Sequence, residues 1–288
     1  MTTAGGRLYI VATPIGNLAD VTFRALEVLR TVPLVAAEDT RHSRRLLAPH
    51  AITTHLVSFH ARNAATRLPE LLAHLRSGAD LALITDAGTP GVSDPGDDLV
   101  RAWAAEDGLV VPIPGASAVL AAVVASGIAG PRWSFEGFLP RSGRERRERL
   151  ARIAADERAT VLYEAPGRVA ATLADLAAAC GEDRPGAACR ELTKIHETVT
   201  RGSLADLAEL ARTGAIPARG EFALVVGSGQ GSGSAGGSAA DAPADREAVA
   251  RAEVERLVAS GVARGDAARR VAAATGLNRR QLYGGGSG

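Results

Sequence analysis

The chain has 288 residues, 46% of them hydrophobic, which allows about two domains with buried cores. Its formal net charge of +1 excludes binding to nucleic acid through overall charge, so any such role must rest on local clusters. The N-terminal stretch MTTAGGRLYIVATP lacks the pattern of a secretory signal, and the longest apolar-rich run, 116–129, is too short to span a bilayer. We therefore expect a soluble, cytoplasmic protein.

Short apolar runs alternate with helical patterns over the first part of the chain. The apolar runs predict strands over Arg7–Thr13, Leu34–Glu38, His55–Phe59, Leu81–Thr85 and Leu109–Ile113. The intervening patterns predict helices over Phe23–Arg30, His42–Leu47, Ala64–Arg76 and Asp97–Glu106, and then a buried helix over Ala116–Ser126. This alternation predicts an α/β domain with a largely parallel sheet, which we place at residues 1–128.

The segment GIAGPR, residues 127–132, interrupts the pattern, and a second alternating block follows. Its predicted strands are Trp133–Phe138, Thr160–Tyr163, Ala187–Arg190 and Phe222–Val226. Its predicted helices are Gly143–Ala155, Val169–Cys180 and Leu204–Arg212. We expect a second, smaller α/β domain over residues 129–227.

The C-terminal part of the chain has a different composition. Residues 228–244 are rich in Gly, Ser and Ala and predict a flexible linker. Residues 245–283 predict a helical segment that resembles a helix–turn–helix, with helices over Arg246–Val258 and Asp266–Thr275 separated by Ser260–Gly261 and Gly265. A turn at Gly276 and a helix cap at Asn278 would follow.

Three turns rich in Gly and Pro each follow a predicted strand: TPIGN at 13–17, DAGTPG at 86–91 and PIPGAS at 112–117. Ligands of open α/β sheets bind outside the carboxyl ends of the strands, so three such loops on one sheet edge predict a shared pocket. The alternative is that each is only a tight connection between a strand and a helix.

The ligand class follows from the residues that these loops lack. The first loop has no G-x-G-x-x-G sequence, and no G-x-x-x-x-G-K-[ST] sequence is present. None of the three loops carries a basic residue that could neutralise a phosphate. A nucleoside-like cofactor without phosphates is therefore the better prediction. Cys180 and Cys189 are expected to be buried thiols, and no cluster has the spacing of metal ligands, so we expect no metal.

Basic residues are distributed unevenly along the chain. One cluster contains Arg41, Arg44 and Arg45, and a second, PRSGRERRERLAR at 140–152, contains Arg141, Arg144, Arg146 and Arg147. Both suit contacts with RNA phosphates, although a solvated helix face explains the second equally well. The arginine-rich C-terminal segment is a third candidate. Lys194 is the only lysine among 33 basic residues, which indicates either a chemical role or an exposed residue without function.

Seven blocks together resemble the tetrapyrrole methylase superfamily: LYIVATPIGNLADVTFRALEVL, AAEDTRHSRRLL, LITDAGTPGVSDPG, VPIPGASAVLAA, FEGFLPR, VLYEAPGRV and RELTKIHETVTRG. They occur in order from Arg7 to Gly227, and they are most similar to the branch that methylates 16S rRNA. The DAGTP spelling, where other branches often carry a G-D-P-type sequence, is typical of this branch and argues against a tetrapyrrole substrate. The resemblance implies two α/β domains of the class III methyltransferase type with a cofactor cleft between them.

The resemblance also implies an activity and its partners. The activity would be S-adenosylmethionine-dependent 2′-O-methylation of a cytidine in 16S rRNA of the small ribosomal subunit, by a homodimer. The residues implied to contact the cofactor are Pro14, Asp86, Ala87, Gly88, Thr89, Pro90, Gly91, Ser117, Arg190 and Leu192. The alternatives are a tetrapyrrole-type small-molecule methyltransferase and a noncatalytic RNA-binding protein with the same fold.

Methyl transfer to a ribose hydroxyl benefits from a base that takes the hydroxyl proton. The candidates by residue type are Glu38, Asp39, Glu164, Glu191, Lys194, His196 and Glu197. Our hypothesis is that Lys194, together with Glu164 or Glu191, orients or deprotonates the hydroxyl, because a nearby cation or desolvation can lower the pKa of a lysine. The alternative is that Lys194 contacts an RNA phosphate. His196 is expected to be structural or to contact RNA.

Overall fold

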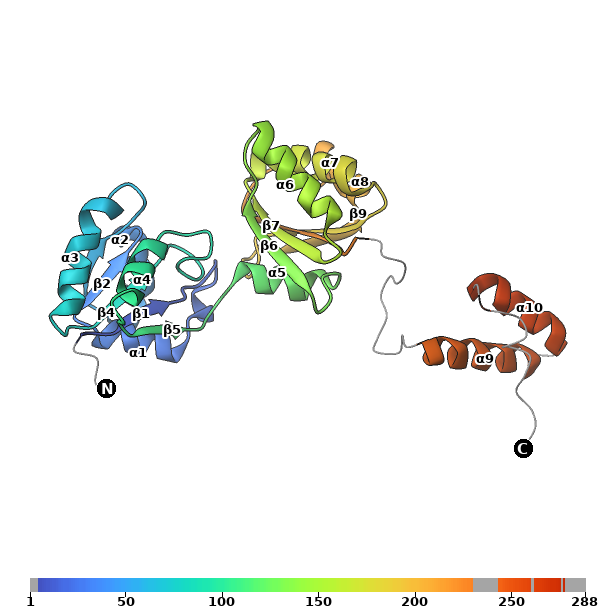
Figure 1. Ribbon diagram of the computed structural model, residues 1–288, viewed down its shortest axis with the longest axis horizontal. Coiled ribbons are helices and arrows are strands. Elements are labelled where there is room, and N and C mark those ends of the chain that lie inside the picture. Colours follow the sequence, from blue (N-terminus) through green and yellow to red (C-terminus); the bar gives the residue numbers. More distant parts are fainter. Residues whose placement is uncertain (1–4, 230–242, 260–261, 276, 278–288) are drawn as a thin grey trace. The chain divides into compact units, whose positions relative to one another are not determined.

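The computed structural model describes residues 5–229, 243–259, 262–275 and 277. The chain divides into two compact units, Met1–Gly231 and Ser232–Gly288. The first unit contains two five-stranded sheets, and the described part of the second unit is helical (Figure 1). None of the helices in the described ranges is long and apolar enough to cross a membrane.

The first sheet is parallel throughout and has the strand order β3-β2-β4-β1-β5. Its strands are β1 (Leu8–Val11), β2 (Leu34–Ala37), β3 (His55–Ser58), β4 (Leu81–Ile84) and β5 (Val110–Ile113). Its helices are α1 (Phe23–Thr31), α2 (Thr40–Leu47), α3 (Ala64–Arg76) and α4 (Asp97–Ala104), with short 3-10 turns at Leu18–Asp20 and Ala48–His50. The predicted alternation and the parallel arrangement are confirmed.

Apolar side chains cover both faces of the first sheet, as expected for parallel strands. Leu29 of α1 and Leu47 of α2 pack on one face with Val35 of β2. Leu75 of α3 and Trp103 of α4 pack on the other face. The central strand β4 is buried along its whole length, so its sequence LALI is a continuous apolar run rather than an alternating one.

The second sheet is mixed and has the order β6-β7-β10-β8-β9, with only the β6–β7 pair parallel. Its strands are β6 (Trp133–Phe138), β7 (Ala159–Glu164), β8 (Pro185–Arg190), β9 (Thr198–Ser203) and β10 (Phe222–Val226). Helices α6 (Gly143–Ala155), α7 (Val169–Cys180) and α8 (Leu204–Arg212) pack on one face, and a 3-10 turn at Pro166–Arg168 precedes α7. Helix α5 (Ala118–Ser126) covers the opposite face (Figure 1).

Helix α5 departs from the prediction of a buried helix. Val119 and Ala122 are buried against the second sheet, whereas Val124 is 80% exposed and Leu120 is 54% exposed. The helix therefore buries only one face, and its composition AVLAAVVAS hides this because both faces are apolar. It packs on β7, β8 and β10, although it precedes the break at 127–132 in the sequence.

Strand β9 was absent from the predicted elements. Its sequence TVTRGS contains one strongly apolar residue, Val199, and its side chains are partly or fully exposed. It forms the edge of the sheet, where it pairs antiparallel with β8 over the whole of Pro185–Arg190. An edge strand of this kind carries almost no hydrophobic pattern to detect.

The described part of the second unit is a pair of helices, α9 (Pro243–Ala259) and α10 (Arg264–Thr275). Their contact is made by the buried residues Ala250, Val254, Ala267, Ala268 and Val271. Gly265 lies inside α10 and does not interrupt it, contrary to the prediction. The predicted turn at Gly276, the cap at Asn278 and most of the predicted linker lie outside the described residues, so the helix–turn–helix remains a prediction.

Candidate functional site

The three loops predicted to share a pocket lie at one edge of the first sheet. They follow β4, β1 and β5, which are neighbouring parallel strands. Thr13 and Gly88 exchange both backbone hydrogen bonds, with N···O distances of 2.9 and 3.1 Å. A Cβ placed on Gly115 would lie 2.9 Å from the Cβ of Ala12, so only glycine allows the third loop to approach so closely.

A cavity of about 340 Å³ lies at this edge, between the first-sheet loops and the second sheet. The first-sheet residues that line it are Ile15, Ala87, Gly88, Thr89, Val92, Ser93, Asp94, Ser117 and Ala118. The residues from the second sheet and its loops are Phe138, Tyr163, Glu164, Ala165, Pro166, Cys189, Leu192, Gly220, Glu221, Phe222 and Ala223. All three predicted loops therefore contribute to one cavity.

The charge of this lining restricts the ligand. Three acidic residues, Asp94, Glu164 and Glu221, belong to it, and no Arg, Lys or His is among its residues in the described part of the chain. The Glu164 side chain has no exposed surface and is paired with Arg168, and Glu221 is paired with Lys194. A lining without a basic side chain offers a phosphate no partner, and the Asp94 carboxylate favours a ligand that carries positive charge. This lining fits S-adenosylmethionine, which is a nucleoside without phosphates and has cationic sulfonium and ammonium groups.

Asp94 lies in the connection between β4 and α4. Burial, reinforced by the charges of Glu38 and Asp86, raises the pKa of its carboxyl to about 6. The Thr85 hydroxyl, 3.5 Å from one carboxylate oxygen, opposes this rise but does not outweigh it. Burial, together with the charge of Asp94, raises the pKa of Tyr163 to about 12. The charge of Asp94, in a loop of the first sheet, thus reaches Tyr163 of the second sheet.

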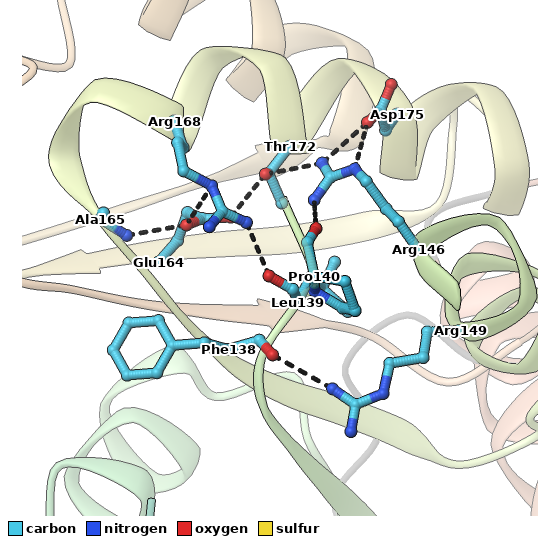
Figure 2. Close-up of polar contacts among 10 residues, drawn as sticks. All are labelled: Phe138, Leu139, Pro140, Arg146, Arg149, Glu164, Ala165, Arg168, Thr172 and Asp175. Atoms are coloured by element: carbon cyan, nitrogen blue, oxygen red, sulfur yellow. Dashed lines mark hydrogen bonds and ion pairs between the residues drawn. The ribbon is translucent and has the colours of Figure 1, made fainter. Parts of the chain in front are cut away.

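Glu164 is saturated with hydrogen bonds inside the protein, as Figure 2 shows. Its carboxylate accepts from the Ala165 amide at 2.8 Å, from the Thr172 hydroxyl at 2.6 Å and from Arg168 at 3.1–3.2 Å. The side chain has no exposed surface. Glu164 therefore fixes the start of α7 against β7, and its lone pairs are already engaged.

Lys194 connects the first loop of the first sheet with glutamates beside the second sheet. Its Nζ lies 2.8 Å from Glu191 and 3.0 Å from Glu221, and its stem lies against Gly16 of the first loop. Burial alone would lower the pKa of Lys194, but its hydrogen bonds and ion pairs with the two glutamates outweigh burial and raise it. The hypothesis of a lysine base requires a lowered pKa, so the structure favours the orienting role over the deprotonating one.

The predicted cofactor contacts divide into two groups. Ala87, Gly88, Thr89, Ser117 and Leu192 line the cavity, whereas Pro14, Asp86, Pro90, Gly91 and Arg190 are not among its lining residues. The Asp86 carboxylate accepts from the Asp39 amide at 3.2 Å. The Arg190 guanidinium donates to the carbonyls of Arg219 and His196 and so supports the loops behind the cavity. The cofactor roles of both groups stay predictions.

The arginines predicted to contact RNA also differ in their environment. Arg44 and Arg45 are exposed on α2, and Arg41, also exposed, pairs with Asp39 and holds the pKa of that carboxyl well below its usual range. Arg141, Arg144 and Arg147 are exposed near or on α6, with Arg144 paired to Glu148.

Arg146 is only 8% exposed and is bonded to Asp175, Thr172 and the Pro140 carbonyl (Figure 2). Its guanidinium is engaged within the protein.

Three cavity groups were missed from the sequence: Asp94, Tyr163 and Glu221. Asp94 belongs to the block LITDAGTPGVSDPG, but only residues 86–91 of that block were predicted to contact the cofactor. Tyr163 and Glu221 sit at a strand end and just before a strand, where nothing in the sequence shows which face they occupy. Among the described residues, no group of three or more His, Cys, Asp or Glu could hold a metal ion.

Comparison with known proteins places this geometry in a family. The sequence profile of Tetrapyrrole (Corrin/Porphyrin) Methylases matches residues 7–208. Among solved structures, cobalt precorrin-4 methyltransferase is similar with a TM-score of 0.60 at 19% identity, over 77% of this chain and 94% of that one. Uroporphyrin-III C-methyl transferase from Thermus thermophilus, complexed with S-adenosyl homocysteine, has a TM-score of 0.56 at 20% identity, over 77% and 97%.

Three curated relatives share the name ribosomal RNA small subunit methyltransferase I. The protein from Synechocystis sp. is 47% identical over 96% of both chains. That from Xylella fastidiosa is 48% identical over 77% of this chain and 81% of its own, and that from Bacillus subtilis is 38% identical over 96% and 93%. The chain belongs to the tetrapyrrole methylase family, and within it to the group that these relatives define. The expected family and fold class are confirmed.

Proposed function

We propose that this chain is an S-adenosylmethionine-dependent methyltransferase that modifies the ribose 2′-hydroxyl of a cytidine in 16S rRNA. The observation that carries the proposal is the cavity itself, which lies at the carboxyl edge of a parallel sheet and has acidic walls without a basic side chain. Its walls favour a cationic nucleoside over a phosphorylated one. The names of the relatives supply the small-subunit RNA as substrate.

The bound cofactor would supply an electrophilic methyl group, and the residues of this chain would orient it. The backbone of Ala87, Gly88 and Thr89 and the side chain of Leu192 would enclose it, and the Asp94 carboxylate would balance part of its positive charge. Lys194, held by Glu191 and Glu221, would fix the first loop against the second sheet. In this arrangement positioning and exclusion of water contribute most of the rate enhancement.

The proposed RNA path begins at α2. Asp39, which caps α2, is hydrogen-bonded through its amide to Asp86 of the β4 loop, so the exposed Arg44 and Arg45 belong to an element that starts beside the cavity. Phosphates held there would lie near a ribose that reaches the methyl group. The exposed Arg141 and Arg147 are a second candidate surface, whereas the buried Arg146 is left out of the proposal.

We also infer a homodimer and a cytoplasmic location, as the sequence resemblance implies. The exposed apolar face of α5, with Val124 and Leu120, offers a surface suited to self-association. Sedimentation equilibrium of the purified chain checks the dimer, and a single species with the mass of one chain, 29.5 kDa, contradicts it.

The deciding experiment uses S-adenosylmethionine labelled in its methyl group. The full chain is incubated with 30S subunits that lack the modification and, in parallel, with protein-free 16S rRNA. We expect label on one cytidine ribose, mapped by resistance of the adjacent phosphodiester to alkaline hydrolysis. Label on a base would overturn the ribose assignment. Cofactor binding without any transfer would favour a noncatalytic RNA-binding protein.

A further inference from the structure

Asp94 differs from the other two carboxylates of the cavity in the partners that it has. Glu164 is saturated by Ala165, Arg168 and Thr172, and Glu221 is paired with Lys194 and is 72% exposed. In the described part of the chain, the Asp94 carboxylate has no ion pair, and only the Thr85 hydroxyl hydrogen-bonds to it, at 3.5 Å. It therefore retains lone pairs that can accept a proton.

The groups around Asp94 keep its affinity for a proton high. Burial contributes most, and the negative charges of Glu38, which follows β2, and Asp86, which follows β4, add to it. The charge of Asp94 also reaches Tyr163 of β7. No cation offsets these charges in the described surroundings of the carboxylate. At neutral pH such a group is ionised, but it accepts a proton more readily than an ordinary aspartate.

The loop that carries Asp94 is held in a defined conformation. Ser93 adopts a left-handed backbone with φ of 64°, which is uncommon for a residue other than glycine. Gly137 of β6, with φ of 60°, faces it so closely that an added Cβ would lie 2.9 Å from the Ser93 Oγ. The loop therefore abuts the second sheet at the cavity, and Asp94 is presented at that junction.

We propose that Asp94 is the catalytic residue that accepts the proton of the substrate hydroxyl during methyl transfer. This inference rests on the proposed function. The hydroxyl oxygen forms a bond to the methyl carbon, and the carbon–sulfur bond breaks with its electron pair passing to sulfur. The hydroxyl proton passes to the Asp94 carboxylate and from there to water. The sulfonium becomes a neutral thioether, so atoms and charge balance without a further reactant.

The test compares Asp94→Asn with Asp98→Asn in the full chain. Both substitutions remove one negative charge from the same part of the chain, but the Asp98 side chain is 69% exposed at the first turn of α4. We expect D94N to slow single-turnover methyl transfer to 30S subunits by about 10²- to 10⁴-fold, the usual contribution of a general base, and D98N to stay within about twofold. Calorimetric titration with S-adenosylmethionine is expected to give D98N the Kd of the parent and to weaken binding to D94N by about tenfold at most, which is less than the loss of rate at saturating cofactor.

The pH dependence of the transfer rate separates a catalytic role of Asp94 from a packing role, because a packing role would leave that dependence unchanged. With the parent chain, the rate is expected to fall about tenfold per pH unit below pH 6 and to be constant above it, because the carboxylate must be ionised. D94N is expected to lose this acidic limb. In the free parent protein, a ¹³C carboxyl resonance is expected to titrate near pH 6 and to be missing from D94N.

Three results would overturn the inference. The first is a rate of D94N within about threefold of the parent with the same pH profile. The second is a loss of cofactor affinity that accounts for the whole loss of rate, which would make Asp94 a binding residue. The third is a carboxyl that titrates near pH 4. The parent chain tests the proposed function separately, because absence of ribose methylation by the parent would refute that function whatever D94N does.

Discussion

Asp94 combines a proposed catalytic role with a cost to stability. Its pKa in the folded chain, about 6, lies above 3.8, the ordinary value of an aspartate. Folding therefore favours the protonated carboxyl, and the contribution of Asp94 to stability is full below pH 4 and is lost as the pH rises through 6. We predict that D94N unfolds at a higher urea concentration than the parent at pH 7.5, by about 1–2 kcal/mol after discounting for solvent screening.

The same pair of proteins supplies the control. Near pH 4 the parent carboxyl is protonated in the folded chain and about half protonated in the unfolded chain, so most of the difference between D94N and the parent should disappear. A difference of equal size at pH 4 and pH 7.5 would contradict this account, because an effect of packing alone does not depend on ionisation.

A second prediction for a single residue concerns the orienting role of Lys194. Its raised pKa and its two glutamate partners predict that it stays charged and holds the loop. We expect K194R to keep methyl transfer within about fivefold, because it preserves the charge, and K194A to lose about tenfold by loosening the contact with Gly16. Both should keep the pH profile of the parent. A folded, cofactor-binding K194R without transfer would contradict the orienting role.

At the scale of elements, the site depends on how the β4–α4 connection meets strand β6. Gly137 and Gly130 both have left-handed backbones, with φ of 60° and 64°, so an alanine at either strains the chain by about 1 kcal/mol. Only Gly137 has a neighbour, the Ser93 hydroxyl, whereas a Cβ on Gly130 would meet nothing within 4 Å. We predict that both variants lose similar stability but that only G137A lowers the rate of transfer, by about tenfold.

Urea unfolding and single-turnover assays on the two glycine variants check this prediction. G130A is the matched control, since it carries the same backbone strain outside the cavity. Equal rates for both variants would show that the contact between Ser93 and Gly137 does not position Asp94.

Most elements of the first unit were predictable because each repeats one pattern. The LALI run of β4 is apolar throughout since both its faces are buried, and helices such as Ala64–Arg76 agree with the structure at both ends. Strand β9 was not predictable, because TVTRGS is held by its pairing with β8 rather than by burial of its own side chains. The exposed face of α5 was not predictable either, because apolar residues occupy both faces of this helix and the sequence does not show which face is buried.

The site was predictable where a loop backbone forms it and not where a tertiary contact does. Gly88 and its neighbours were found because Gly and Pro after a strand mark a close approach. The raised pKa of Asp94 comes first from burial and then from the charge of Glu38, 56 positions earlier in the sequence, and the charge of Asp94 reaches Tyr163 of the other sheet. Interactions between residues so far apart in the sequence leave no local sequence pattern.

At the scale of the whole molecule, charge is the property that bears on RNA binding. The chain is almost neutral, and residues 232–288 contain eight arginines against six acids. In the described part of this segment, Arg256, Arg264 and Arg269 are each paired with a carboxylate of α9 or α10. Helix α2 is therefore the stronger candidate, since Arg44 and Arg45 are exposed and no ion pair engages them in the described part of the chain.

We predict that the double variant R44A/R45A weakens binding to 30S subunits and lowers the slope of log Kobs against log salt by about 1–2, because each phosphate contact contributes slightly less than one unit. R67A/R101A is the control, since it removes the same charge from α3 and α4 on the other face of the first sheet. Binding measured between 50 and 200 mM salt decides the matter. Equal losses of slope in both double variants would mean that only net charge matters, and that α2 is not the site of RNA contact.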